Sequence, residues 1–166
     1  ADSVDALGVR GDATRRLAVM RESGVGAFGV TVVVFVALTQ VTSVAAIVES
    51  GTWWALGAAP VLGRLAAAVA LAGRIPARPD GLAARYGGRE SVPGLLLLTL
   101  PLVPLFAFPA SPWRLALVVA TVIVGAAVPG LFTRRLGGIT GDVVGATVLL
   151  TETFVLLVAA VLGGLL

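Results

Sequence analysis

Long apolar runs separated by short charged segments dominate the chain. Five runs are long enough to cross a bilayer as helices, at approximately 25–48, 53–73, 92–109, 115–131 and 143–166. The third run contains four prolines and should be kinked, and Pro129-Gly130 should end the fourth. The pattern therefore predicts an all-α fold, a polytopic transmembrane helical bundle of about five membrane helices that forms one domain over residues 1–166.

Composition supports a membrane protein and removes several kinds of chemistry. Apolar residues make up 58% of the chain and charged residues only 13%, as expected for a surface that contacts lipid. Because the chain has no cysteine and no histidine, disulfides, thiolate zinc sites and catalysis by Cys or His are excluded. A metal ion would need oxygen ligands, which favours magnesium, calcium or manganese.

Arginine is concentrated in alternate segments between the apolar runs. Ten arginines lie before residue 24 and in the loops 74–91 and 132–142, whereas Arg114 is the one arginine of the opposite-side segments. Because cytoplasmic loops retain basic residues, this bias places the N-terminus and both loops in the cytoplasm. The net charge of +3 therefore reflects loop topology, and no nucleic-acid partner is expected.

The remaining topology follows from that orientation. Residues 1–24 are expected to form a cytoplasmic acidic segment and an interfacial helix, and residues 25–166 the transmembrane bundle. Trp53, Trp54 and Trp113 should lie at the outer interface as aromatic anchors. Any chemistry should face the cytoplasm.

The N-terminal segment carries two carboxylates that share a helix face. Asp2 and Asp5 are three positions apart, so on a helix they can hold a divalent cation between them or form a solvated patch. Asp12 is expected to cap a short helix that continues to Arg21 and lies on the inner leaflet. Since the chain begins with Ala1 rather than Met and shows no signal region, we expect a fragment of a longer protein.

The stretch 136–146 joins loop glycines to an aspartate at the start of the last apolar run. Asp142 can cap that helix or take part in chemistry, and the stretch alone leaves both open. Gly141 and Gly145 have the spacing of a helix-packing motif. The adjacent Arg134 and Arg135 suit phosphate oxygens, so the combination indicates phosphoryl chemistry at the membrane face.

Four sequence blocks span nearly the whole chain. They are the acidic segment 1–8, the segment 15–29, the pair 59–64 and 76–82, and the glycine-rich run 136–146 with Glu152 behind it. In order and spacing they resemble the cobalamin-5′-phosphate synthases, also called adenosylcobinamide-GDP ribazoletransferases. The chain departs from that family's pattern at Ala18 and Leu149, where glutamate is usual. The resemblance implies a multi-pass protein of a bacterial or archaeal cell membrane.

The resemblance also implies a reaction and a site. The 5′-hydroxyl of α-ribazole, or of its phosphate, attacks the cobinamide-bearing phosphorus of adenosylcobinamide-GDP and releases GMP with magnesium assistance. Asp142 is the implied catalytic residue, and Asp2 and Asp5 are the implied magnesium ligands. The implied substrate-binding residues are Arg134, Arg135, Arg78, Arg64, Gly138, Gly141 and Glu152. A homo-oligomer is left open.

Two other classes of function compete with this interpretation. The run from Asp80 to Arg85 imitates the core of the CDP-alcohol phosphotransferase signature, but the flanking aspartates of that signature are replaced by Ala77, Leu98 and Leu102. A non-enzymatic transporter or assembly protein would also form a helical bundle. Transport predicts polar groups continuing to the outer face, whereas the charged groups here cluster on the cytoplasmic side.

Arg64 and Glu152 are the two charges deep inside apolar runs, where unpaired ions are costly. Each lies about nine or ten residues, roughly 15 Å, from the expected cytoplasmic boundary. Because the depths match, we predict that the two side chains face each other inside the bundle, beneath the active-site floor.

Overall fold

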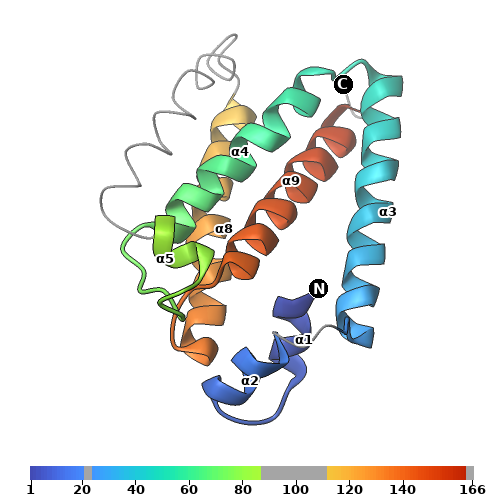
Figure 1. Ribbon diagram of the computed structural model, residues 1–166. Helices are drawn as coiled ribbons and strands as arrows, with labels where there is room; N and C mark the ends of the chain where they lie inside the picture. The colour runs from blue at the N-terminus through green and yellow to red at the C-terminus, as the bar shows by residue number, and fades with distance from the viewer. Residues whose placement is uncertain (21–23, 87–111, 164–166) are drawn as a thin grey trace.

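The computed structural model describes residues 1–20, 24–86 and 112–163, and these residues are helical with short connections (Figure 1). Its long helices are α3 (Ala27–Ser50), α4 (Trp54–Leu71), α8 (Pro112–Leu136) and α9 (Gly141–Gly163), and its short ones are α1 (Asp2–Gly8), α2 (Ala13–Val19) and α5 (Leu82–Tyr86). The four long helices are each long and apolar enough to span a membrane. The all-α membrane bundle is confirmed, with four candidate spans in the described residues. The predicted span 92–109 lies outside those residues.

Helix α9 is the centre of the bundle. It runs between α3 and α4 and also packs against α8, as Figure 1 shows. The contact between α4 and α8 is close, because a Cβ on Gly125 would lie 2.9 Å from the Ala66 carbonyl oxygen. Small residues therefore let membrane helices approach at backbone distance here. The orientation of the bundle in the membrane stays a prediction.

Helix α8 does not end at Pro129-Gly130, as the sequence had indicated, and this prediction was wrong. The helix continues through Pro129 to Leu136, so the connection to α9 is only residues 137–140. Proline removes one N–H donor, but neighbouring helices can satisfy the backbone groups that it frees. The helix ends instead at Gly137, which adopts the left-handed conformation (φ 74°) and donates its N–H to the Thr133 carbonyl.

The short helices gather at the end of the bundle where α3 and α9 begin (Figure 1). Helix α1 contacts α3, α8 and α9, and α2 packs against α1 and α8. The buried side chains of Ala6, Met20, Leu71, Leu136 and Val143 join these elements in one apolar cluster. The predicted cap of α2 is confirmed, because Asp12 Oδ1 accepts the Arg15 N–H at 2.9 Å.

Two connections far apart in sequence pair along their backbones at the same end. The Ala77 N–H donates to the Ile139 carbonyl at 2.8 Å, and the Ile139 N–H donates to the Ile75 carbonyl at 2.9 Å. This bridge between Pro76 and Ile139 ties the segment after α4 to the segment before α9. The bridge holds Arg78 close to the start of α9.

Candidate active site

The first turn of α9 presents Asp142 without using it as a cap. Thr140 has that role, because its hydroxyl oxygen accepts the Val143 N–H at 3.3 Å. Asp142 is exposed, and none of the residues that the structure describes donates a hydrogen bond to its carboxylate or forms an ion pair with it. Of the two roles that the sequence left open, the capping role therefore belongs to Thr140.

Asp142 and Asp2 line the same cavity. This larger cavity has a volume of about 300 Å³ and lies between α1, α3 and α9. Asp2, like Asp142, receives no hydrogen bond from the described part of the chain. Two carboxylates that are 140 positions apart in sequence therefore share a space that a ligand could enter.

The remaining walls of the larger cavity are mostly apolar. Helix α3 contributes Val32, Val33 and Val36, and α9 contributes Leu149 and Leu150. A Cβ on Gly145, which also lines the cavity, would meet no atom within 4 Å. Gly145 therefore widens the cavity, and the prediction that it packs against another helix is not supported by any described neighbour.

Asp142 also lines a second, smaller cavity. It has a volume of about 110 Å³, and its lining includes Arg78, Thr140, Gly141 and Asp142. Arg78 is half-buried and is held by one hydrogen bond from Nη2 to the Leu17 carbonyl oxygen at 2.6 Å. The structure thus brings Arg78 to Asp142 and its chain neighbour Gly141, and their contact with a substrate stays a prediction.

Asp5 lies against α3 rather than beside Asp142. Its two carboxylate oxygens accept the N–H groups of Gly26 and Gly29, each at 2.9 Å. Asp5 does not line either of these cavities. The role of Asp5 as a metal ligand stays a prediction, and its position at the start of α3 gives it a second role.

Gly138 and the two arginines of α8 stand apart from both cavities. A Cβ on Gly138 would lie 2.5 Å from the Ala77 nitrogen, so this glycine permits the backbone bridge. Arg134 and Arg135 are exposed in the last turn of α8, and the Arg135 carbonyl accepts a hydrogen bond from Arg16 Nη1 at 3.3 Å. Their contact with substrate stays a prediction.

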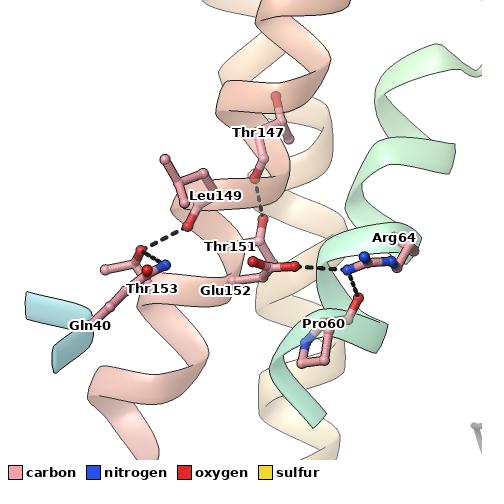
Figure 2. A network of polar contacts seen from close by, with 8 residues as sticks. All are labelled: Gln40, Pro60, Arg64, Thr147, Leu149, Thr151, Glu152 and Thr153. Carbon is pink, nitrogen blue, oxygen red and sulfur yellow. Dashed lines mark hydrogen bonds and ion pairs between the residues drawn. The ribbon is translucent and has the colours of Figure 1, made fainter. Parts of the chain in front are cut away.

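The predicted pairing of Arg64 and Glu152 is confirmed. Figure 2 shows Arg64 Nη1 on α4 reaching Glu152 Oε1 on α9 at 2.9 Å, with a second bond to the Pro60 carbonyl. Gly63 makes room for the acid, because a Cβ there would lie 2.8 Å from Glu152 Cγ. The location differs from the prediction, since the Arg64 side chain is 60% exposed and that of Glu152 is 23% exposed. The pair is therefore not enclosed by the described helices.

Comparison with known proteins then identifies the family. The sequence model of the family described as cobalamin-5-phosphate synthase matches residues 1–160. The chain belongs to this family. Curated relatives named adenosylcobinamide-GDP ribazoletransferase include proteins of Frankia casuarinae, 38% identical over 88% of this chain and 57% of the relative, and Chlorobium phaeovibrioides, 34% identical over 97% and 66%. A Pseudomonas aeruginosa relative is 36% identical over 96% of this chain and 65% of its own length.

These matches also show how much of a family member's length the chain covers. It spans 57% to 66% of the length of these three curated relatives. No solved structure matches the chain. Family membership favours the ribazoletransferase interpretation over a CDP-alcohol phosphotransferase or a transporter.

Sequence reasoning about this family member missed two features of the site. The apolar wall from α3 was not foreseen, because Val32, Val33 and Val36 look like ordinary lipid-facing residues of a membrane span. The docking of Asp5 on Gly26 and Gly29 was also missed. The three-residue spacing of those glycines, next to an acidic segment with no assigned partner, was the available signal.

Proposed function

We propose that the protein is a membrane-embedded transferase that joins adenosylcobinamide-GDP to α-ribazole, or to its 5′-phosphate, and releases GMP. The observation that carries this proposal is the meeting of Asp2 and Asp142 in one cavity. These residues come from the first and fourth of the sequence blocks that resemble the family. The curated relatives' name supplies the substrates, and the cavity supplies a place for the phosphate chemistry.

The acidic residues of the larger cavity fit magnesium. Among residues 1–20, 24–86 and 112–163, no cluster of three or more acidic side chains could hold a metal ion by itself. Magnesium commonly takes one or two carboxylates and completes its shell with water and substrate phosphates. Asp2 and Asp142 would hold it, and when bound it would offset the negative charge of the diphosphate and of the leaving GMP.

The reaction forms one P–O bond and breaks another. The 5′-hydroxyl oxygen of ribazole attacks the cobinamide-bearing phosphorus, and the bond from that phosphorus to the bridging oxygen of GMP breaks. Asp142 orients the attacking hydroxyl, whose proton passes to solvent water, and the departing GMP keeps the electron pair of the broken P–O bond. Arg78, which lines the smaller cavity together with Asp142, neutralises phosphate oxygens there.

The arginines that do not line these cavities have subsidiary roles in this proposal. Arg134 and Arg135 carry positive charge at the same end of the bundle and attract the anionic nucleotide substrate. The arginine distribution supports a cytoplasmic location for this end. In this orientation Asp2 and Asp142 face the compartment that supplies the nucleotide.

Carboxamide substitutions test the proposal, because they remove a charge and preserve the shape of the side chain. In the membrane-embedded protein, Asp142→Asn should lower GMP release from adenosylcobinamide-GDP and α-ribazole by roughly 100-fold or more, the size typical of losing one preorganised electrostatic group. Asp2→Asn should raise the magnesium concentration needed for half-maximal activity. Asp12→Asn is the matched control, because asparagine also caps a helix and Asp12 lies outside both cavities.

Each variant has an outcome that would contradict the role proposed for its residue. Wild-type turnover in Asp142→Asn would remove the catalytic role of this residue. An unchanged magnesium titration in Asp2→Asn would return Asp2 to a solvated surface patch. Equal losses in Asp12→Asn would show that any loss of negative charge at this end lowers activity.

A further inference from the structure

Both carboxylate oxygens of Asp5 on α1 accept hydrogen bonds from the start of α3. Its Oδ2 accepts the Gly26 N–H and its Oδ1 accepts the Gly29 N–H, both at 2.9 Å. Gly26 is the N-cap residue of α3, and Gly29 lies in its first turn. Backbone N–H groups at a helix start have no acceptor within the helix, and the macrodipole favours a negative charge there. The Asp5 side chain on α1 thereby caps α3 through residues that lie 21 and 24 positions further along the chain.

The two glycines are what allow this approach. A Cβ on Gly26 would overlap the Asp5 carboxylate, and a Cβ on Gly29 would overlap the same carboxylate and come within 3.0 Å of the Ala1 Cα. Any larger residue at either position would push α1 away from α3. Gly26 and Gly29 therefore form the contact surface on which the Asp5 carboxylate docks.

The contact of Asp5 with α3 contributes to the position of Asp2. Asp2 and Asp5 are three positions apart on α1, so both are on the same side of this helix. Tertiary packing positions a helix, and α1 packs against α3 as well as against α2, α8 and α9. Docking Asp5 on α3 therefore helps to hold Asp2 at the cavity that it shares with Asp142.

We propose that Asp5 is a positioning residue, which docks α1 on the start of α3 and so places the Asp2 carboxylate opposite Asp142. The inference rests on the proposed function, because it assigns Asp5 a role in assembling the same magnesium site. It differs from the expectation that Asp5 is itself a ligand. In this arrangement Asp5 acts through Asp2, in the way that outer residues orient the ligands of many metal sites.

The two roles predict different behaviour for Gly26, which can affect Asp5 but offers no side chain to a metal. Manganese(II) binding to the detergent-solubilised protein, followed by the loss of the free-ion electron paramagnetic resonance signal, measures the site without turnover. We expect Asp5→Ala and Gly26→Ala each to weaken manganese binding by roughly 10-fold or more, with the number of bound ions unchanged. Gly24→Ala is the matched control, because a Cβ there would meet no atom within 4 Å.

The double variant tests the contact itself. Once Asp5 is alanine, the space that a Cβ on Gly26 needs is vacant, so Asp5→Ala with Gly26→Ala should bind manganese no more weakly than Asp5→Ala alone. Asp5→Asn provides a milder variant, because asparagine keeps one acceptor oxygen for one of the two N–H groups and replaces the other oxygen by an NH2 donor. Its affinity should lie between those of the wild type and Asp5→Ala. Circular dichroism of each variant verifies that the helical bundle is formed.

Two results would overturn the positioning role while leaving the proposed function in place. In the first, Asp5→Ala abolishes the bound ion as Asp2→Asn does, whereas Gly26→Ala binds it normally, and Asp5 is then a direct ligand. In the second, the Asp5 and Gly26 variants bind manganese and release GMP like the wild type, whereas Asp2→Asn and Asp142→Asn fail. If Asp2→Asn and Asp142→Asn themselves behave like the wild type in both assays, the proposed function fails and the positioning role fails with it.

Discussion

Removing one member of the Arg64–Glu152 pair should cost more stability than removing both. The two side chains meet at 2.9 Å between neighbouring membrane helices, and Arg64 Nη1 also binds the Pro60 carbonyl (Figure 2). Glu152→Gln leaves an arginine without its carboxylate partner, and Arg64→Leu leaves a carboxylate without its cation. The double variant leaves neither charge behind.

The membrane location of the pair sets the expected size of this coupling. Arg64 and Glu152 lie within candidate membrane spans, so the 60% and 23% exposure of their side chains is not a measure of contact with water. Polar contacts between membrane helices average about 0.6 kcal/mol, with a maximum of about 1.7. Because this contact joins two opposite charges, we expect a coupling free energy at the upper end of that range, about 1–1.7 kcal/mol.

The two single variants should also differ from each other. A stranded carboxylate can become neutral by taking up a proton, whereas a stranded guanidinium keeps its charge. Glu152→Gln should therefore lower the free energy of unfolding more than Arg64→Leu does. A charged residue at the centre of a membrane helix costs about 2.5–3.5 kcal/mol on insertion scales, which bounds the loss from above.

Unfolding of the four proteins by sodium dodecyl sulfate in mixed micelles, followed by circular dichroism, completes the double-mutant cycle. A double variant that is more stable than Glu152→Gln alone would support the coupling. Losses that simply add, within about 0.3–0.5 kcal/mol, would refute it. An equal loss in the two single variants would refute the argument about the stranded arginine.

Three glycines give further predictions that the same unfolding assay or hydrogen exchange can check. Gly125→Ala should lower the free energy of unfolding by about 1–3 kcal/mol, because its Cβ would press on the Ala66 carbonyl, and an unchanged midpoint would contradict this close packing. Gly130→Ala on the same helix should raise stability by up to about 1 kcal/mol, because its Cβ would meet nothing within 4 Å. Gly138→Ala should break the backbone bridge, so the Ala77 N–H should exchange faster with deuterium, and unchanged protection would refute that reason.

The helices were largely predictable because a membrane span is recognisable in the sequence as a long apolar run. The apolar runs at 25–48, 53–73 and 143–166 correspond to α3, α4 and α9 within a few residues at each end. The end of α8 was mispredicted, because a proline followed by glycine usually ends a helix in water. Inside a bundle the neighbouring helices stabilise the backbone beyond Pro129, and Gly137 takes over as the terminator.

The sequence predicted which residues carry the chemistry of the site, but it did not predict which groups those residues contact. Asp142 and Asp2 were singled out as functional, and the structure brings them to one cavity. Asp5 was grouped with Asp2 because their spacing alone does not distinguish a carboxylate that binds a metal ion from one that accepts backbone hydrogen bonds. Its partners are backbone N–H groups, which have no signature in side-chain chemistry. Arg64 and Glu152 were paired successfully because a charge in a membrane span has few alternatives.

Glycines illustrate why a motif can be read correctly and still be assigned the wrong role. Gly29 and Gly145 both belong to regularly spaced glycine pairs, yet a Cβ on Gly29 would overlap Asp5, whereas a Cβ on Gly145 would meet nothing. The first glycine is needed so that another element can approach, and the second leaves space in the larger cavity. Tertiary packing decides between close approach and open space, because a regularly spaced glycine pair in the sequence is compatible with either. Alanine at Gly145 should consequently reduce the space available to substrate while leaving the fold intact, whereas alanine at Gly29 should displace α1 and the Asp2 carboxylate with it.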